Sequence, residues 1–205
     1  MNFSLSEEHK MIQAAARDFA QKAKEGVIER DTHMAYPTDL VKEMGELGFM
    51  GIMTSPVYGG SGMDTLSYVL AMEEISKIDA SASVIMSAHN SLALYGIEQY
   101  GSEALKEKYL APLASGKAIG CFCLSEPEAG SDATSQKTTA IDKGDHYVLN
   151  GIKNWITNGG KADYHIVIAQ TDREKGHRGI NASVVEKNWA GVELGAKEDK
   201  LGIRS

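Results

Sequence analysis

Apolar residues recur at intervals of three and four through the first half of the chain, which is the spacing of helices that bury one face. The first predicted helix runs from about residue 5 to 24, and a capping-box pattern of Ser4 and Glu7 marks its start. Further helices are predicted at about 37–47, 64–77, 80–99 and 103–115. In the third helix we expect a buried face made by Leu66, Val69, Leu70 and Ile75. Residues 1–116 therefore form a predicted all-helical domain.

Beyond residue 116 the apolar residues fall into short runs that Gly, Asn and Asp interrupt, a pattern typical of strands and turns. The predicted strands are 118–124, 134–141, 146–150, 152–157, 164–170, 179–186 and 192–194, with a turn at 142–145 joining the second and third. Asn150-Gly151 is a strong signal for a hairpin turn between two of them. Short strands at this spacing indicate an antiparallel β-barrel or sandwich over residues 117–205. The predicted fold class is α+β, with the helical domain first.

Composition excludes several classes of partner. A formal charge of -7 and a pI near 5.4 leave no basic stripe for nucleic acid, and Lys and Arg are scattered. No apolar run approaches the roughly 20 residues that a membrane span needs. The first six residues lack the basic and apolar regions of a signal peptide, so we expect a cytoplasmic protein.

The two cysteines, Cys121 and Cys123, lie two residues apart and would point to one face of a strand. This is not a zinc-binding spacing, and no two of the six His show the spacing of a helical metal site. We expect reduced, buried cysteines that contribute to packing, and no metal.

The chain changes architecture at residues 121–132. A short apolar strand leads to Pro127, and then to a turn of small residues, Ala129-Gly130-Ser131-Asp132. Small residues leave backbone N–H groups and a hydroxyl accessible to a phosphate, although such loops are also common as plain turns. From the residues alone both interpretations stay open.

Several stretches resemble the acyl-CoA dehydrogenase flavoenzymes. Cys123-Leu-Ser-Glu-Pro-Glu-Ala-Gly-Ser-Asp132, followed by Ser135, is similar to the signature of that family. Residues 56–62, 150–157 and 200–204 resemble three further stretches, so the similarity covers essentially the whole chain. Within the family, the short-chain (butyryl-CoA) branch is the most similar.

The resemblance implies an FAD site. Backbone groups of Phe122, Cys123 and Leu124 would lie along the flavin ring edge, with the Ser125 hydroxyl on a ring oxygen. Ser131 would bind the phosphates and also touch the CoA arm of the substrate. Trp155 would cover a ring face, with the Ile156 backbone and the Thr157 hydroxyl near N5, and Lys200 would contact substrate.

Each of these roles has a structural alternative. Ser125 and Ser131 are also expected to satisfy local backbone groups, Trp155 to lie in a core, and Thr157 to stabilise a turn. Glu126 and Asp132 stand beside a phosphate site, so we interpret them as turn or ion-pair residues.

The resemblance implies a flavin-dependent dehydrogenation of an acyl-CoA thioester, with electrons passed to an electron-transfer flavoprotein. It also implies a homo-oligomer in the complete protein. In the family a glutamate of a third, helical domain is the base, so we expect no catalytic base in these 205 residues, a middle domain incomplete at its C-terminal end, and little activity of this chain alone. An acyl-CoA oxidase, a non-catalytic acyl-CoA-binding module and a scaffold fragment are the alternatives.

Overall fold

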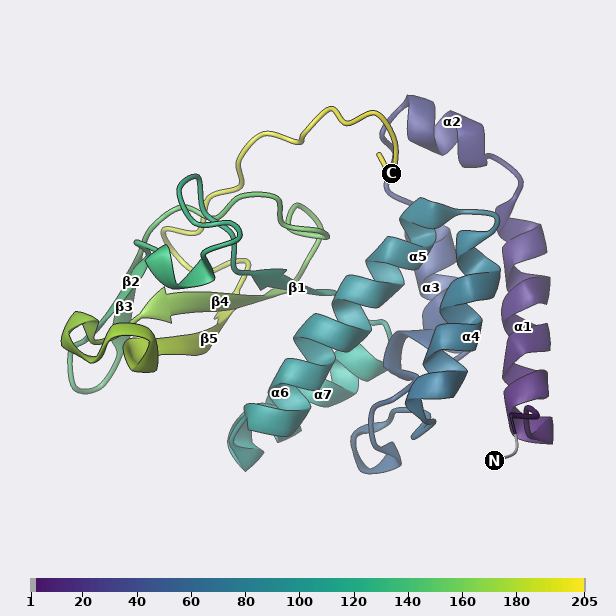
Figure 1. Ribbon diagram of the computed structural model, residues 1–205, viewed down its shortest axis with the longest axis horizontal. Helices are drawn as coiled ribbons and strands as arrows, with labels where there is room; N and C mark the ends of the chain where they lie inside the picture. The colour runs from purple at the N-terminus through teal and green to yellow at the C-terminus, as the bar shows by residue number, and fades with distance from the viewer. Residues whose placement is uncertain (1–2, 205) are drawn as a thin grey trace. The chain divides into compact units, whose positions relative to one another are not determined.

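The structure is a computed structural model that describes residues 3–204 (Figure 1). The chain forms two compact units, residues 1–118 with 199–205, and residues 119–198. The first unit is helical and the second contains a β-sheet, so the predicted order of a helical part followed by a β part is confirmed.

The helical unit contains every helix that the apolar spacing predicts. Its α-helices are α1 (Glu7–Ala23), α2 (Val27–Thr32), α3 (Thr38–Glu46), α4 (Thr65–Ser76), α5 (Ala80–Ser87), α6 (Tyr95–Tyr100) and α7 (Glu103–Ala114). Short 3-10 turns occur at Phe49–Gly51 and Pro56–Tyr58. The α1 capping box uses Ser6 and His9 instead of the predicted pair. Sequence analysis missed α2, because none of its six residues is buried and it therefore carries no apolar period.

The core of the helical unit lies where α1, α4 and the segment after α3 meet. The rings of Phe19 and Phe49 pack edge to face, with centroids 6.0 Å apart. Other large side chains that are fully buried in this unit are Met44, Met50, Ile52, Ile75, Met86, Leu94, Leu110 and Leu113. Burial of side chains of this size supplies about 1.5–3 kcal/mol each, so these residues hold the helices together.

The predicted buried face of α4 is partly wrong. Leu66 and Val69 are 44% and 50% exposed. The buried residues of the helix are Ser67, Leu70, Ala71, Glu74 and Ile75. The Glu74 carboxylate can lie on this buried face because it pairs with Arg17 of α1.

The helix predicted over residues 80–99 is continuous but contains a π-helical segment, Ala88–Leu94, between α5 and α6. Asn90 accounts for this change of pitch. Its amide nitrogen donates to the carbonyl oxygens of Met86, at 3.0 Å, and Phe49, at 2.9 Å, while its amide oxygen accepts from the Ile52 N–H at 3.2 Å. A buried side chain thus takes hydrogen bonds that a regular α-helix keeps within its backbone.

The sheet of the second unit is mixed, so the prediction of a purely antiparallel barrel or sandwich is wrong, and within the described residues it is not closed into a barrel. Its strands are β1 (Gly120–Cys123), β2 (Thr139–Asp142), β3 (Tyr147–Asn150), β4 (Tyr164–Gln170) and β5 (Ile180–Glu186). Strand β4 is parallel to β1 and to β2 and antiparallel to β5, and β2 and β3 are antiparallel. The strand order β1-β4-β2-β3, with β5 on β4, does not close within the described residues.

The predicted strand 152–157 is absent, and this is why the sheet is mixed. Residues 151–163 form an irregular connection that brings the chain back to run parallel to β1. The turn predicted at 142–145 is confirmed, because the hairpin turn lies between β2 and β3 at residues 143–146. The second signal, Asn150-Gly151, does not form a hairpin. Gly151 instead allows a close backbone approach, since a Cβ there would collide with Thr138. The predicted strand 134–141 starts late, after a 3-10 turn (Ala133–Ser135), and residues 192–194 are not a strand.

No helix within residues 3–204 is long and apolar enough to cross a membrane.

Glu74 of α4 is buried against α1, where it pairs with Arg17. Its carboxylate is 4% exposed and accepts hydrogen bonds from both Nε and Nη2 of Arg17 at 3.0 Å. Lys77 donates a further bond at 3.1 Å. The bonds from Arg17 lower the pKa of Glu74, burial opposes this and Lys77 adds to it, and the pKa falls from 4.5 to about 2.

We predict that Glu74→Gln lowers the free energy of unfolding at neutral pH by about 2 kcal/mol, because it removes charge-assisted hydrogen bonds at a buried position. Since the folded pKa lies below the ordinary value, this stabilisation is complete above pH 4.5 and is lost as the pH falls to about 2. Urea unfolding across this range should show the difference from wild type shrinking. Glu73→Gln, at an exposed neighbour of the same helix, is the control. A difference that persists at the lowest pH would contradict the assignment.

Candidate functional site

Strand β1 carries the first predicted site residues at an edge of the sheet. Within the described residues β1 pairs with β4 alone, so one side of its backbone has no strand partner. Edge strands present N–H and C=O groups that are available to another molecule. Phe122 is half-buried, as are Leu124 and Ser125 just after the strand. The backbone predicted to line a ring edge is therefore at an accessible position.

Cys121 and Cys123 lie on the buried face of β1. Both are free, with their sulfur atoms 3.7 Å apart. The hydrogen bond with Cys123 and burial both raise the pKa of the Cys121 thiol, which keeps it protonated. The prediction that both are reduced packing residues is confirmed.

The loop after β1 is held by its own acidic residues. Asp132 accepts hydrogen bonds from Ser135 and from the N–H and hydroxyl of Thr134, which close the 3-10 turn at 133–135. The hydrogen bond from Ser135, followed by that from Thr134, lowers the pKa of Asp132. Lys137 forms an ion pair with Glu128 across the loop. Asp132 is thus a turn residue, as predicted, and Ser131 next to it is exposed.

Trp155 stands in an unusual backbone conformation in the connection 151–163. Its φ is 60°, in the left-handed region that bulky residues rarely occupy. The Trp155 side chain is 68% exposed, which contradicts the alternative that it lies in a core. An exposed aromatic residue held at a cost of about 1–3 kcal/mol in backbone strain points to a functional position.

A buried ion pair joins this connection to the loop after β1. Lys153 and Glu126 are 9% and 6% exposed at their side chains, and the Lys153 Nζ lies 2.7 Å from Glu126 Oε1. Lys153 also donates to the carbonyl oxygen of Leu124 at 2.9 Å and to the side-chain oxygen of Gln136 at 3.2 Å. The next N–H, that of Asn154, donates to the Ser125 carbonyl oxygen at 2.8 Å.

Glu126 also binds the backbone of residues 137 and 138, at the end of the loop that follows β1. Its carboxylate accepts the backbone N–H of Lys137 at 2.5 Å and that of Thr138 at 3.0 Å. Burial, the largest influence, raises the pKa of Glu126, but the hydrogen bonds from Lys153 and from the segment 137–138 together outweigh it and lower the pKa to about 2. The prediction that Glu126 is an ion-pair residue is confirmed. We name Glu126, Lys153 and the backbone groups that they bind the Lys153 clamp.

The hydroxyl groups of the predicted site residues are free. Those of Ser125, Ser131 and Thr157 make no hydrogen bond to any residue in the range 3–204. Ser125 is half-buried, and Ser131 and Thr157 are exposed. This argues against the alternative that they satisfy local backbone groups. The clamp brings the residues around Ser125 together with those around Trp155, whereas Lys200 belongs to the helical unit, where it is exposed.

Sequence reasoning missed Lys153. The residue lies between Ile152 and Asn154 in a stretch that alternates like a strand, where a lone lysine is expected to face solvent. The signal in the sequence was Glu126, interpreted there as a turn or ion-pair residue, but nothing local to Glu126 identifies which of the scattered lysines is its partner.

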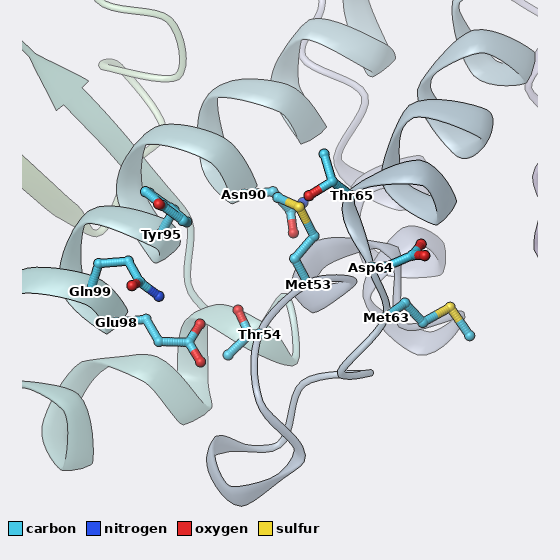
Figure 2. Close-up of a pocket in the computed structure, with 9 residues that line it drawn as sticks. All are labelled: Met53, Thr54, Met63, Asp64, Thr65, Asn90, Tyr95, Glu98 and Gln99. Carbon is cyan, nitrogen blue, oxygen red and sulfur yellow. The ribbon is translucent and has the colours of Figure 1, made fainter. Parts of the chain in front are cut away.

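A cavity of about 280 Å³ lies in the helical unit, between the loop before α4 and the helix that follows α5 (Figure 2). Its lining residues are Met53, Thr54, Met63, Asp64, Thr65, Asn90, Tyr95, Glu98 and Gln99. None of them is a predicted site residue. Asn90 is already engaged by the hydrogen bonds that shape the π segment, and Glu98 accepts from the Ser55 N–H.

The chain belongs to the acyl-CoA dehydrogenase family. The model of the family's N-terminal domain matches residues 6–117, and the model of its middle domain matches residues 121–205. Together they cover both units of the structure.

Individual relatives agree with this. The chain is 47% identical over 206 residues to a short-chain specific acyl-CoA dehydrogenase of Clostridium acetobutylicum, covering 100% of this chain and 54% of that protein. Butyryl-CoA dehydrogenase from Megasphaera elsdenii matches with a TM-score of 0.94 and 44% identity, over 100% of this chain and 55% of that one. A chain in a structure described as the electron transferring flavoprotein of Acidaminococcus fermentans matches with a TM-score of 0.97 and 46% identity, over 100% and 54%. The chain therefore spans about half the length of these relatives.

We predict that Lys153→Met lowers the free energy of unfolding by about 3–5 kcal/mol, because it leaves the Glu126 carboxylate buried without its counter-charge. Thermal and urea unfolding followed by circular dichroism measure this. Lys143→Met, in the exposed β2–β3 turn, is the matched control and should behave like wild type. Equal stability of the two variants would show that the clamp does not hold the second unit together.

Proposed function

We propose that this chain is part of a flavin-dependent acyl-CoA dehydrogenase that removes hydrogen from the α and β carbons of a short-chain acyl-CoA. The observation that carries the proposal is the Lys153 clamp, which ties the chain around Ser125 to the connection that carries the exposed Trp155. The hydroxyls of Ser125, Ser131 and Thr157, which make no hydrogen bond within the described residues, support it. Because the chain spans about half of its relatives, the activity is proposed for the protein to which it contributes.

The residues present fit FAD. A flavin ring needs hydrogen-bond donors along one edge and an apolar surface against one face. The free side of β1 and the Ser125 hydroxyl provide the first, over residues Phe122, Cys123 and Leu124. The Trp155 indole provides the second, with the Ile156 backbone and the Thr157 hydroxyl beside it.

Ser131 suits the phosphates of the cofactor and the CoA arm of the substrate. Ser131 is exposed, and the acidic residues Asp132 and Glu126 of the same loop are already paired. Asp132 accepts hydrogen bonds within its own turn, and Glu126 is buried in the clamp. Neither carboxylate therefore has to face a phosphate, which removes the repulsion that their sequence positions suggest.

FAD, when bound, supplies the acceptor for the β hydride, which no side chain can replace. The chain's own contribution is to bind and orient: backbone and hydroxyl donors at the ring edge stabilise the charge that arrives there. We propose that the base for the α proton comes from outside these 205 residues. The resemblance to the family gives the role of base to a glutamate, and no carboxylate of this chain matches that residue.

The remaining assignments belong to the same proposal. Lys200 contacts the acyl-CoA substrate, electrons pass to an electron-transfer flavoprotein, and the complete protein is a homo-oligomer. A cytoplasmic location and a domain division between residues 116 and 117 are proposed on the sequence alone.

We predict that the 205-residue chain binds FAD saturably but weakly, and that Ser131→Ala and Trp155→Ala each weaken binding about tenfold, since each removes one cofactor contact. The quenching of tryptophan fluorescence and the change in flavin absorbance during an FAD titration measure this. Trp189→Phe, at an exposed residue outside both segments, is the control for the fluorescence change.

A folded chain that takes up no FAD at any concentration would contradict the proposal, as would binding that both alanine variants leave unchanged. Activity requires a further test: the complete protein should oxidise butyryl-CoA with a dye acceptor, and the 205-residue chain alone should not.

A further inference from the structure

The hydrogen bonds of Lys153 are those of a residue that fixes the positions of its neighbours. An ammonium group has three donors, and all three are used, on the Leu124 carbonyl, the Glu126 carboxylate and the Gln136 side chain. No donor remains for a ligand, and the side chain is 9% exposed. Lys153 therefore acts on a bound molecule only through its neighbours.

The contact with Leu124 has an electronic consequence. The Leu124 carbonyl oxygen, which accepts the hydrogen bond from Lys153, belongs to the same peptide group as the Ser125 N–H. A charged donor on the oxygen of a peptide polarises it and makes its N–H a stronger donor. The Asn154 N–H binds the next carbonyl, that of Ser125, so two successive peptides are held in one orientation at the proposed ring edge.

The same lysine also bears on Trp155. Lys153 and Asn154 are fixed to the loop after β1, and the strained backbone of Trp155 follows directly. A strained residue keeps its conformation only where the surroundings over-determine it. On the far side, Glu126 holds residues 137 and 138, where the loop that carries Ser131 ends.

We propose that Lys153 is a positioning residue for the flavin. Through the clamp it polarises the Leu124–Ser125 peptide and sets the relative positions of the ring-edge backbone, Trp155 and the loop that carries Ser131. This inference rests on the proposed function. It assigns flavin affinity to a residue that does not touch the flavin.

The test separates this role from a purely structural one. Three variants are compared with wild type: Lys153→Met, Glu126→Gln, and the double variant carrying both changes. The double variant removes both charges, so no uncompensated charge stays buried and the urea midpoint should return most of the way to that of wild type. Its Leu124 carbonyl is still unbound, so its FAD affinity should remain about tenfold weaker than that of wild type.

A second measurement tests the ammonium group itself. Lys153→Ala leaves space for a small amine, and added ethylammonium should restore part of the FAD affinity and of the flavin absorption spectrum. Sodium chloride at the same concentration, and ethylammonium added to Lys143→Met, are the controls. Restoration by the amine alone is expected if the ammonium positions the flavin edge.

The outcomes are distinct. If the double variant recovers stability and FAD affinity together, or if ethylammonium restores nothing, Lys153 is only a structural residue and the inference is wrong while the proposed function stands. If wild type itself binds no FAD, the proposed function fails and the inference fails with it.

Discussion

The second unit depends on one buried ion pair, that of Lys153 with Glu126. A charge removed from water must be compensated, and here each partner is compensated completely by groups from other segments. The need to satisfy these two charges therefore fixes three pieces of irregular chain relative to each other: the end of β1, the end of the loop that carries Ser131, and the connection that carries Trp155. Irregular segments lack the regular backbone hydrogen bonds that join strands in a sheet, so the ion pair and its hydrogen bonds hold these three segments in place.

The helical unit uses the same device. Glu74 is buried against Arg17, and Asp79 is buried against Arg30, whose Nη2 lies 2.8 Å from its carboxylate. Asp79 also accepts the N–H of Ala82 and so begins α5. In both units a buried acid combines a cationic partner with backbone N–H groups. Such pairs are costly to break, because the remaining charge stays buried.

Much of the helical unit could be predicted, because a helix of ten residues or more that packs on one side must repeat its apolar residues. The segment α2 could not, since none of its residues is fully buried and it shows no apolar period. Leu66 and Val69 were misassigned because Glu74, a charged residue, holds a core position that only its distant partner explains. In the sheet, β4 was predicted with its observed bounds, but whether it runs parallel to β1 depends on contacts between residues far apart in sequence.

The site residues were found through resemblance, and the sequence misled in one respect. Residues 152–157 alternate like a strand, yet a left-handed residue at Trp155 interrupts any ladder. The two residues before it, Lys153 and Asn154, are held by hydrogen bonds to the loop after β1, which no local pattern reveals. The features that favour a flavin, free hydroxyls and an exposed tryptophan, became visible only with the side chains in place.

The most direct test of this account is a crystal structure of the 205-residue chain with FAD. We predict the flavin ring edge along residues 122–125, the indole of Trp155 against a ring face, and the phosphates at Ser131, with Lys153 and Glu126 still paired beneath them. Flavin bound elsewhere, or a Trp155 that relaxes to an extended backbone when FAD binds, would contradict the account.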